Sequence, residues 1–317
     1  MSVKLMCVSH SPLMGHVSPR DKRQEDVVNE TFVKFGQIVK DYNPTLIVVV
    51  GPDHFNGFFY DLMPSFCIGV RATAVGDWGY GGHLDVPEDI ALNMVRHVLD
   101  EGIDTAYSYR MQADHGITQP LHLMFDGQTD RYPIIPIFVN AAAVPLPTTK
   151  RTIALGRAVG SFLKTLDLDK ERVLLLGTGG LSHDPPTPQM GSVPPEVEEF
   201  LIAGRNPTPE ARQARQERVI GVGQRLAAGD TTISLPLDEE WDKGLLEKLK
   251  NAEFDALAQM SEFDIRQQGG RGGQEVRTWM ACFAALNEIG QYDTTIHCYE
   301  PISEWIAGFA MVTADLK

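Results

Sequence analysis

Three histidines stand where short apolar segments of this chain end. His10, His54 and His183 each follow a run of aliphatic residues that is typical of a buried strand. In open α/β sheets, ligands bind outside the carboxyl ends of the strands. Three imidazoles delivered to one such edge predict a metal site or an acid/base site.

Aspartates are the direct neighbours of three histidines. The pairs are Asp53-His54, Asp114-His115 and His183-Asp184. A carboxylate close to an imidazole can fix its tautomer and increase its basicity. Adjacent residues on a strand face opposite ways, however, so each aspartate fits equally well as a loop cap or a turn residue. Both interpretations stay open at the level of sequence.

Signatures of several other enzyme classes are missing from the sequence. There is no GxxxxGK[ST], no HExxH and no GxSxG pattern, so phosphate-loop, zincin and serine-hydrolase chemistry have no support. The four cysteines, Cys7, Cys67, Cys282 and Cys298, are widely separated and include no CxxC pair. This spacing suggests neither a zinc knuckle nor a disulfide framework.

Composition narrows the class of protein further. The chain has 317 residues, 43% of them hydrophobic, and a formal net charge of −14. Such an acidic balance argues against nucleic acid or an anionic membrane surface as the main partner. We see no signal peptide and no apolar run that is long enough to span a bilayer, so we expect a cytoplasmic protein.

Strand and helix patterns alternate along the chain, which predicts an α/β fold. Strands are expected over 3–9, 46–50, 65–70, 173–176 and 308–313, with an edge or irregular strand over the proline-containing segment 132–140. Helices are expected over 21–42, 87–101, 118–125, 148–166 and 275–289, with mostly helical structure over 194–268. Segments 72–86 and 269–273 are rich in glycine and are expected to form loops. Nothing marks a domain boundary, so we predict one domain over residues 1–317.

Five sequence segments together resemble the class III extradiol ring-cleavage dioxygenases, the proteins related to the catalytic subunit of protocatechuate 4,5-dioxygenase. The segments are 1–12 (MSVKLMCVSHSP), 51–55 (GPDHF), 113–116 (ADHG), 179–185 (GGLSHDP) and 273–275 (GQE). The resemblance covers nearly the whole chain. It implies a single α/β domain with a central mixed sheet flanked by helices. It also implies extradiol cleavage of a 3-substituted catechol with O₂, the expected substrates being 2,3-dihydroxyphenylpropionate and 2,3-dihydroxycinnamate. Enzymes of this kind are by default homo-oligomers.

The resemblance also implies a role for five residues. Fe²⁺ would be held by His10, His54 and Glu275, and His115 and His183 would transfer protons. Two imidazoles and one carboxylate on one face leave three coordination positions open, enough for both catechol oxygens and O₂. The resemblance implies that His183 accepts a proton from the substrate and that His115 donates one. Sequence spacing alone does not decide which of the two is the base and which is the acid.

Structural alternatives exist for each of these residues. His10 and His54 could be hydrogen-bonded strand-end histidines, and Glu275 could be a first-turn acid favoured by the helix dipole. His115 could simply begin a helix, and His183 could cap the turn that follows it. The glycines before Glu275 favour a functional role, because they allow its backbone to pass close to the site.

Two other functions use the same sheet edge. One is a Zn²⁺-dependent hydrolase, and the other is a non-catalytic metal-binding protein. Among the remaining histidines, His122 is expected to be packed, and His83 could belong to a lid over the site. Phe55, Trp78 and Tyr80 could stack on an aromatic ring, although aromatic residues more often belong to the core.

Overall fold

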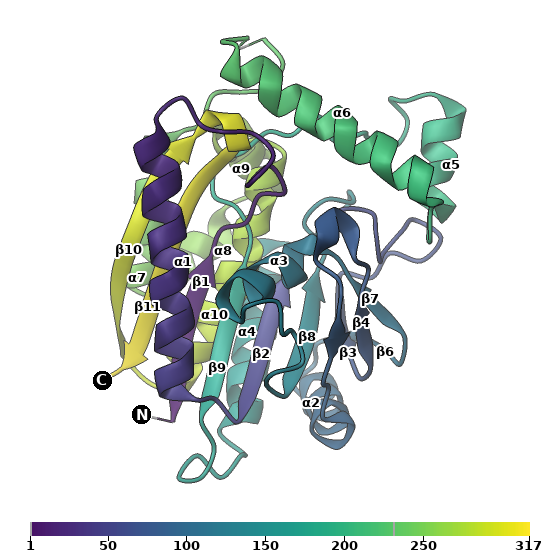
Figure 1. The fold of residues 1–317 in the computed structure, drawn as a ribbon. Helices are drawn as coiled ribbons and strands as arrows, with labels where there is room; N and C mark the ends of the chain where they lie inside the picture. Colours follow the sequence, from purple (N-terminus) through teal and green to yellow (C-terminus); the bar gives the residue numbers. More distant parts are fainter. Residues whose placement is uncertain (1, 231) are drawn as a thin grey trace.

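A mixed sheet of eight strands runs through the middle of the molecule (Figure 1). A computed structural model describes residues 2–230 and 232–317. The strands lie in the order β10 (Tyr292–Ile302), β11 (Ala307–Leu316), β1 (Val3–Val8), β9 (Val173–Thr178), β2 (Leu46–Gly51), β8 (Ile134–Val139), β3 (Phe66–Gly69) and β6 (Ala106–Ser108). The neighbours β1, β9, β2 and β8 are parallel. Their carboxyl ends therefore meet at one edge of the sheet.

Helices cover both faces of the sheet, which explains why the central strands are apolar throughout. α1 (Lys22–Tyr42) and α3 (His115–Met124) pack on one face. α2 (Glu88–Asp100), α4 (Thr149–Leu163) and α10 (Val276–Ile289) pack on the other. Alternate residues of β1 serve the two layers, since Leu5 and Cys7 face α10 and Met6 and Val8 face α1. The predicted α/β fold with a central mixed sheet is confirmed.

Two helices extend across the strand ends. α5 (Pro195–Ala203) and α6 (Pro209–Ala227) lie beyond the carboxyl edge of the parallel strands, at the top of Figure 1. α7 (Glu239–Lys250), α8 (Phe254–Gln259) and α9 (Glu262–Gly269) follow and pack beside the sheet. The mostly helical structure predicted for 194–268 is thus confirmed. Across the described residues, no helix is both long and apolar enough to cross a bilayer.

The prediction of an edge or irregular strand over segment 132–140 is wrong. The strand in this segment, β8, lies inside the sheet between β2 and β3. Pro136 is tolerated there because the pairing with β3 covers only residues 137–139 of β8. The residue that comes next on β3 is Gly69, and a Cβ at that position would lie 2.8 Å from Pro136 Cγ. A glycine opposite the ring therefore makes room for proline in an interior strand.

Segment 72–86 is also not the simple loop that its glycines suggest. It contains β4 (Ala72–Ala74), the short 3-10 helix η1 (Asp77–Gly79) and β5 (His83–Leu84). β4 pairs with β5 and with β7 (Met111–Ala113) in a separate three-stranded sheet. Because β7 comes almost forty residues after β4, local composition could not reveal this pairing. His83 is exposed on β5, and its place in a lid stays a prediction.

The glycine-rich segment 269–273 differs from the flexible loop that we predicted. Gly269 ends α9, and residues 272–275 form the 3-10 helix η2 (Gly272–Glu275), which is buried. A Cβ on Gly272 would lie 2.0 Å from His183 Cδ2. These glycines therefore serve a close approach between two chain segments rather than flexibility.

Candidate active site

The carboxyl edge of the sheet brings together all five residues that the sequence singled out. His10 follows β1, His183 follows the adjacent β9, and His54 follows β2. His115 is the first residue of α3, and Glu275 ends η2 directly before α10. The rings of His10 and His54 lie 5.4 Å apart, and those of His54 and His115 stack at 4.3 Å.

Glu275 lies at the centre of this group and is only 5% exposed. Its Oε1 is 3.1 Å from His54 Nε2 and 3.3 Å from His183 Nε2, and its Oε2 is 3.8 Å from His10 Nε2. Gly180 donates its backbone N–H to Oε2 at 2.8 Å. The side chain makes no capping hydrogen bond to α10. The carboxylate therefore faces the histidines and Gly180 and not the N–H groups of α10, although Glu275 stands directly before this helix.

His54 is oriented by an aspartate that is distant in the sequence. Its backbone N–H donates to Asp114 Oδ2 at 2.8 Å, and its Nδ1 lies 3.0 Å from the same oxygen. The carboxylate accepts the Nδ1 proton, and this fixes the ring so that Nε2 faces Glu275. Asp53, the neighbour in the chain, instead accepts three backbone N–H groups from residues 56–58 and caps the loop. Asp114 therefore orients a histidine, whereas Asp53 is a loop cap.

His115 is held by a carboxylate that the sequence analysis missed. Asp77 Oδ2 lies 2.5 Å from His115 Nδ1, and Asp77 Oδ1 accepts the backbone N–H of His115 at 3.0 Å. Asp77 is 2% exposed and sits in η1. No sequence motif joins two residues 38 positions apart, and the glycine-rich surroundings of Asp77 indicated a loop.

His183 is fixed by its own turn and by the glycines of the next segment. Its Nδ1 lies 2.9 Å from the carbonyl oxygen of Leu181, and its backbone N–H donates to the carbonyl of Gly269. Because a carbonyl oxygen can only accept, Nδ1 carries a proton, and Nε2 faces Glu275 Oε1. Asp184 points elsewhere and pairs with Arg271 at 2.7 Å.

Burial and charge shift the pKa values of these groups in opposite directions. Burial lowers the pKa of His10 to about 3, despite the attraction of Glu275. Burial also opposes charge on His54, but Asp114 and Glu275 outweigh it and raise the pKa of that ring well above its usual value. Burial disfavours charge on Glu275 as well, yet His183, His54 and His10 hold its pKa well below the usual range. The site therefore keeps an anion at Glu275 and favours positive charge beside it.

The donor set fits a metal ion. Three imidazoles, those of His10, His54 and His115, offer nitrogen atoms that lie within 4.8 Å of one another. His10 Nδ1 is buried and has no hydrogen-bond partner among the described residues. A buried imidazole that lacks a hydrogen-bond partner is costly unless another group satisfies it. The other nitrogen of the His10 ring, Nε2, faces Glu275 Oε2 at 3.8 Å, which is too long for a hydrogen bond, and a cation between the two groups would be held by both.

The aromatic residues that we considered for stacking differ in how close they lie to the site. Trp78 lies close to the site, with its ring 6.3 Å from that of His115. Phe55 is buried and packs against Phe59 and Tyr60. His122 is half-buried, as expected for a packed residue, and contacts the carbonyl of Gly81.

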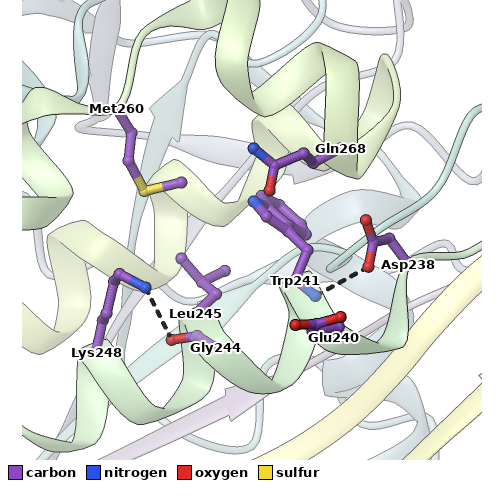
Figure 2. Close-up of a pocket in the computed structure, with 8 residues that line it drawn as sticks. All are labelled: Asp238, Glu240, Trp241, Gly244, Leu245, Lys248, Met260 and Gln268. Atoms are coloured by element: carbon purple, nitrogen blue, oxygen red, sulfur yellow. Dashed lines mark hydrogen bonds between the residues drawn. The ribbon is translucent and has the colours of Figure 1, made fainter.

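A surface hollow of about 510 Å³ beside α7 is a separate feature (Figure 2). None of its lining residues, all in the described part of the chain, belongs to the group of histidines and Glu275. Two of the polar side chains in Figure 2 serve the helix itself, since Asp238 caps the N–H of Trp241 and Lys248 reaches the carbonyl of Gly244. A Cβ on Gly269 would lie 2.5 Å from the ring of Trp241. This ring therefore supports the segment that leads to Glu275.

Comparison with known proteins agrees with this geometry. Residues 4–310 match the family described as the catalytic LigB subunit of aromatic ring-opening dioxygenase. The chain is 57% identical to a 2,3-dihydroxyphenylpropionate/2,3-dihydroxicinnamic acid 1,2-dioxygenase of Photorhabdus laumondii, over 99% of this chain and 98% of that protein. It is 45% identical to the protein of the same name from Rhodococcus rhodochrous, over 100% and 99% of the two chains. The protein of that name from Cupriavidus pinatubonensis is 44% identical over 99% of both chains.

The match to this family covers far more than half of the chain and confirms the resemblance to the class III extradiol dioxygenases. It favours ring-opening chemistry over the hydrolase alternative. Dioxygenases of this family depend on a metal, in agreement with the donor set at the strand ends. The chain therefore belongs to the LigB family of aromatic ring-opening dioxygenases and is an extradiol ring-cleaving enzyme.

Proposed function

We propose that this enzyme cleaves 2,3-dihydroxyphenylpropionate, and its 2,3-dihydroxycinnamate analogue, next to the diol with O₂. The relatives whose names carry these substrates align with the chain from end to end. The observation that carries the proposal is the position of Glu275 within 3.1–3.8 Å of three histidines at the strand ends. We further propose that the whole chain acts as one catalytic domain.

His10, His54 and Glu275 would hold the metal ion, for which we propose Fe²⁺. A set of two histidines and one carboxylate with open positions is typical of non-heme Fe(II) oxygenases. When bound, the ion supplies adjacent coordination positions and the redox activity that O₂ chemistry needs. Asp114 supports the set by orienting His54 through Nδ1. A carboxylate in this position increases the basicity of the ligand and fixes its ring.

His183 and His115 would move the protons. His183 donates its Nδ1 proton to the carbonyl of Leu181, so Nε2, which faces Glu275, is the atom that would accept a proton from a catechol hydroxyl group. His115 Nδ1 donates a hydrogen bond to Asp77. Its Nε2 would deliver a second proton to the oxygen that leaves during ring opening. Both rings are at least half-buried and are held by fixed partners, which limits the rotation that proton transfer would otherwise have to overcome.

Oxygen uptake tests the reaction directly. The protein would be loaded with Fe²⁺ without air, mixed with 2,3-dihydroxyphenylpropionate and then exposed to O₂. We expect one O₂ consumed per substrate and a yellow product of the muconic-semialdehyde type. Glu275→Ala should lose bound iron, whereas His115→Ala and His183→Ala should keep iron and lose turnover.

Other outcomes would contradict the proposal. No oxygen uptake with any 3-substituted catechol, although iron is bound, would leave a non-catalytic metal-binding protein. Full turnover with Zn²⁺ in place of Fe²⁺ would contradict a redox role for the metal.

We also propose a homo-oligomer in the cytoplasm, and the four free cysteines suit a reducing compartment. Analytical ultracentrifugation would test the assembly.

A further inference from the structure

One arginine on α6 reaches the rim of the active site. Arg215 Nη2 lies 3.5 Å from the carbonyl oxygens of both His54 and Phe55. The side chain is half-buried, and its guanidinium lies over the ring of Phe200 at 4.3 Å from the centroid. A guanidinium that stacks on an aromatic ring is held in one plane. Arg215 is thus a positioned cation beside the backbone of a proposed metal ligand.

The position of α6 does not depend on Arg215 alone. At the other end of the helix, a Cβ on Gly223 would lie 2.9 Å from the carbonyl oxygen of Glu304 and 3.0 Å from Leu13 Cδ1. One turn before Arg215, Arg212 donates to the carbonyl oxygen of Val75 at 2.9 Å. The helix is therefore fixed on both sides of Arg215.

Two other arginines near the strand-end loops are neutralised, whereas Arg215 is not. Arg205 pairs with Asp61, and Arg271 pairs with Asp184. Within residues 2–230 and 232–317, Arg215 has no carboxylate at ion-pair distance.

The acidic groups closest to this arginine are engaged elsewhere. Asp53 caps the loop after β2, Asp77 holds His115, and Asp114 holds His54. A guanidinium has five N–H donors, and here they make two long contacts to carbonyl oxygens. Most of its hydrogen-bonding capacity is left for an anion from outside the chain.

We propose that Arg215 binds the carboxylate of the substrate side chain and so selects catechols that carry an acidic tail. This inference rests on the proposed function, since the diol must be held at His10, His54 and Glu275. A propionate or acrylate tail places its carboxyl carbon about 4 Å from the ring, and the same subsite would therefore serve both substrates. A planar guanidinium matches a carboxylate through two parallel hydrogen bonds.

The charge of the chain favours such a subsite. The chain carries a formal charge of −14, and Asp77, Asp114 and Glu275 lie at or beside the site. An anionic substrate that approaches these groups is repelled unless a cation stands where its tail is bound. Arg215 supplies this cation on the α6 side of the site.

The test compares two substrates of matched size. In Arg215→Met, we expect kcat/KM for 2,3-dihydroxyphenylpropionate to fall about 10- to 150-fold, the loss typical of one charge-assisted interaction. For 3-propylcatechol, which replaces the carboxylate by a methyl group, we expect a change of less than about threefold. Arg215→Lys keeps the charge without the planar fork and should give an intermediate loss for the acidic substrate.

Two variants on the same helix serve as controls. Arg212→Met removes a tether of α6 to Val75, and Arg218→Met removes an exposed positive charge one turn further on. Both should leave the ratio of the two kcat/KM values unchanged. If either control alters this ratio as strongly as Arg215→Met, the general charge or position of α6 is responsible and the proposal is wrong.

The remaining outcomes separate this inference from the function on which it rests. If Arg215→Met lowers kcat/KM equally for both substrates, the residue is structural. The proposed subsite is then overturned, but the proposed ring cleavage is not. An unchanged preference for the acidic substrate overturns it as well. If the wild-type enzyme cleaves neither catechol, the proposed function fails and this inference fails with it.

Discussion

Replacing Asp77 by asparagine removes the charge that faces His115 while it keeps the shape of the side chain. Asp77 uses one oxygen for the backbone N–H of His115 and the other for the Nδ1 proton. In Asp77→Asn, the amide oxygen must stay on the backbone N–H, which can only donate. The NH₂ group then faces Nδ1, and two N–H groups cannot face each other. The ring is forced to keep Nδ1 unprotonated and cannot hold protons on both nitrogens.

The size of the effect follows from this geometry. A hydrogen bond to a charged group contributes about 1.5–3 kcal/mol, and a buried group left without its partner costs a similar amount. At about 1.36 kcal/mol for each factor of ten, we expect kcat to fall about 10- to 150-fold. KM for the catechol and the iron content should stay close to wild-type values, because Asp77 makes no contact with His10 or Glu275.

The matched control is Asp114→Asn, which makes the same change at the partner of His54. Asp114 orients a proposed metal ligand rather than a proton donor, so the loss should appear as about 10- to 100-fold weaker metal binding. Steady-state oxygen uptake at saturating iron, together with metal titration of both variants, separates the two effects. Thermal unfolding of each variant would show that the fold is intact.

Three results would refute this reasoning. Asp77→Asn could retain more than half of the wild-type kcat, it could lose iron in place of turnover, or Asp114→Asn could lose turnover at full iron occupancy. The first would show that His115 transfers no proton in the slow step. The others would mean that the roles assigned to His115 and His54 are exchanged.

Further predictions concern metal affinity and two close contacts. Because Asp114 and Glu275 raise the pKa of His54 well above its usual value, metal binding has to displace a proton, and affinity should fall about tenfold per pH unit below that pKa in a Mn²⁺ titration. Gly272→Ala would place a Cβ 2.0 Å from His183 Cδ2, and a displacement of about 1 Å should lower kcat about 100-fold in the oxygen assay. Gly156→Ala would place a Cβ 2.2 Å from a backbone oxygen of α10 and should lower the free energy of unfolding by about 1–3 kcal/mol in urea.

A third glycine serves as the control for both substitutions. A Cβ on Gly221, in α6, would meet nothing within 4 Å. Gly221→Ala should therefore leave kcat unchanged and stabilise the protein by up to about 1 kcal/mol, since alanine favours helix more than glycine does. Equal losses in Gly221→Ala and Gly156→Ala would contradict the contact argument. A metal affinity that does not change with pH would contradict the proton displacement.

The sequence by itself determined the central strands and the edge at which the chemistry lies. Continuous aliphatic runs that stop at a glycine or proline, such as 46–50, are typical of buried strands, and a histidine just after such a run lies where the strand ends. The five residues of the site could be named because short motifs around them resemble one family. The roles of these residues as ligands or proton carriers remain proposals.

The tertiary structure alone decided which groups hold those five residues. Asp114 is hydrogen-bonded to His54 and lies 3.7 Å from Nδ1 of its own neighbour His115, whereas Asp77 makes the hydrogen bond to His115 from a segment whose glycines predicted a loop. The strand in 132–140 lies inside the sheet because a glycine on another strand admits its proline. Each of these contacts joins residues far apart in the chain. Local patterns report local backbone preference and burial, whereas partners across the fold depend on strand order and packing.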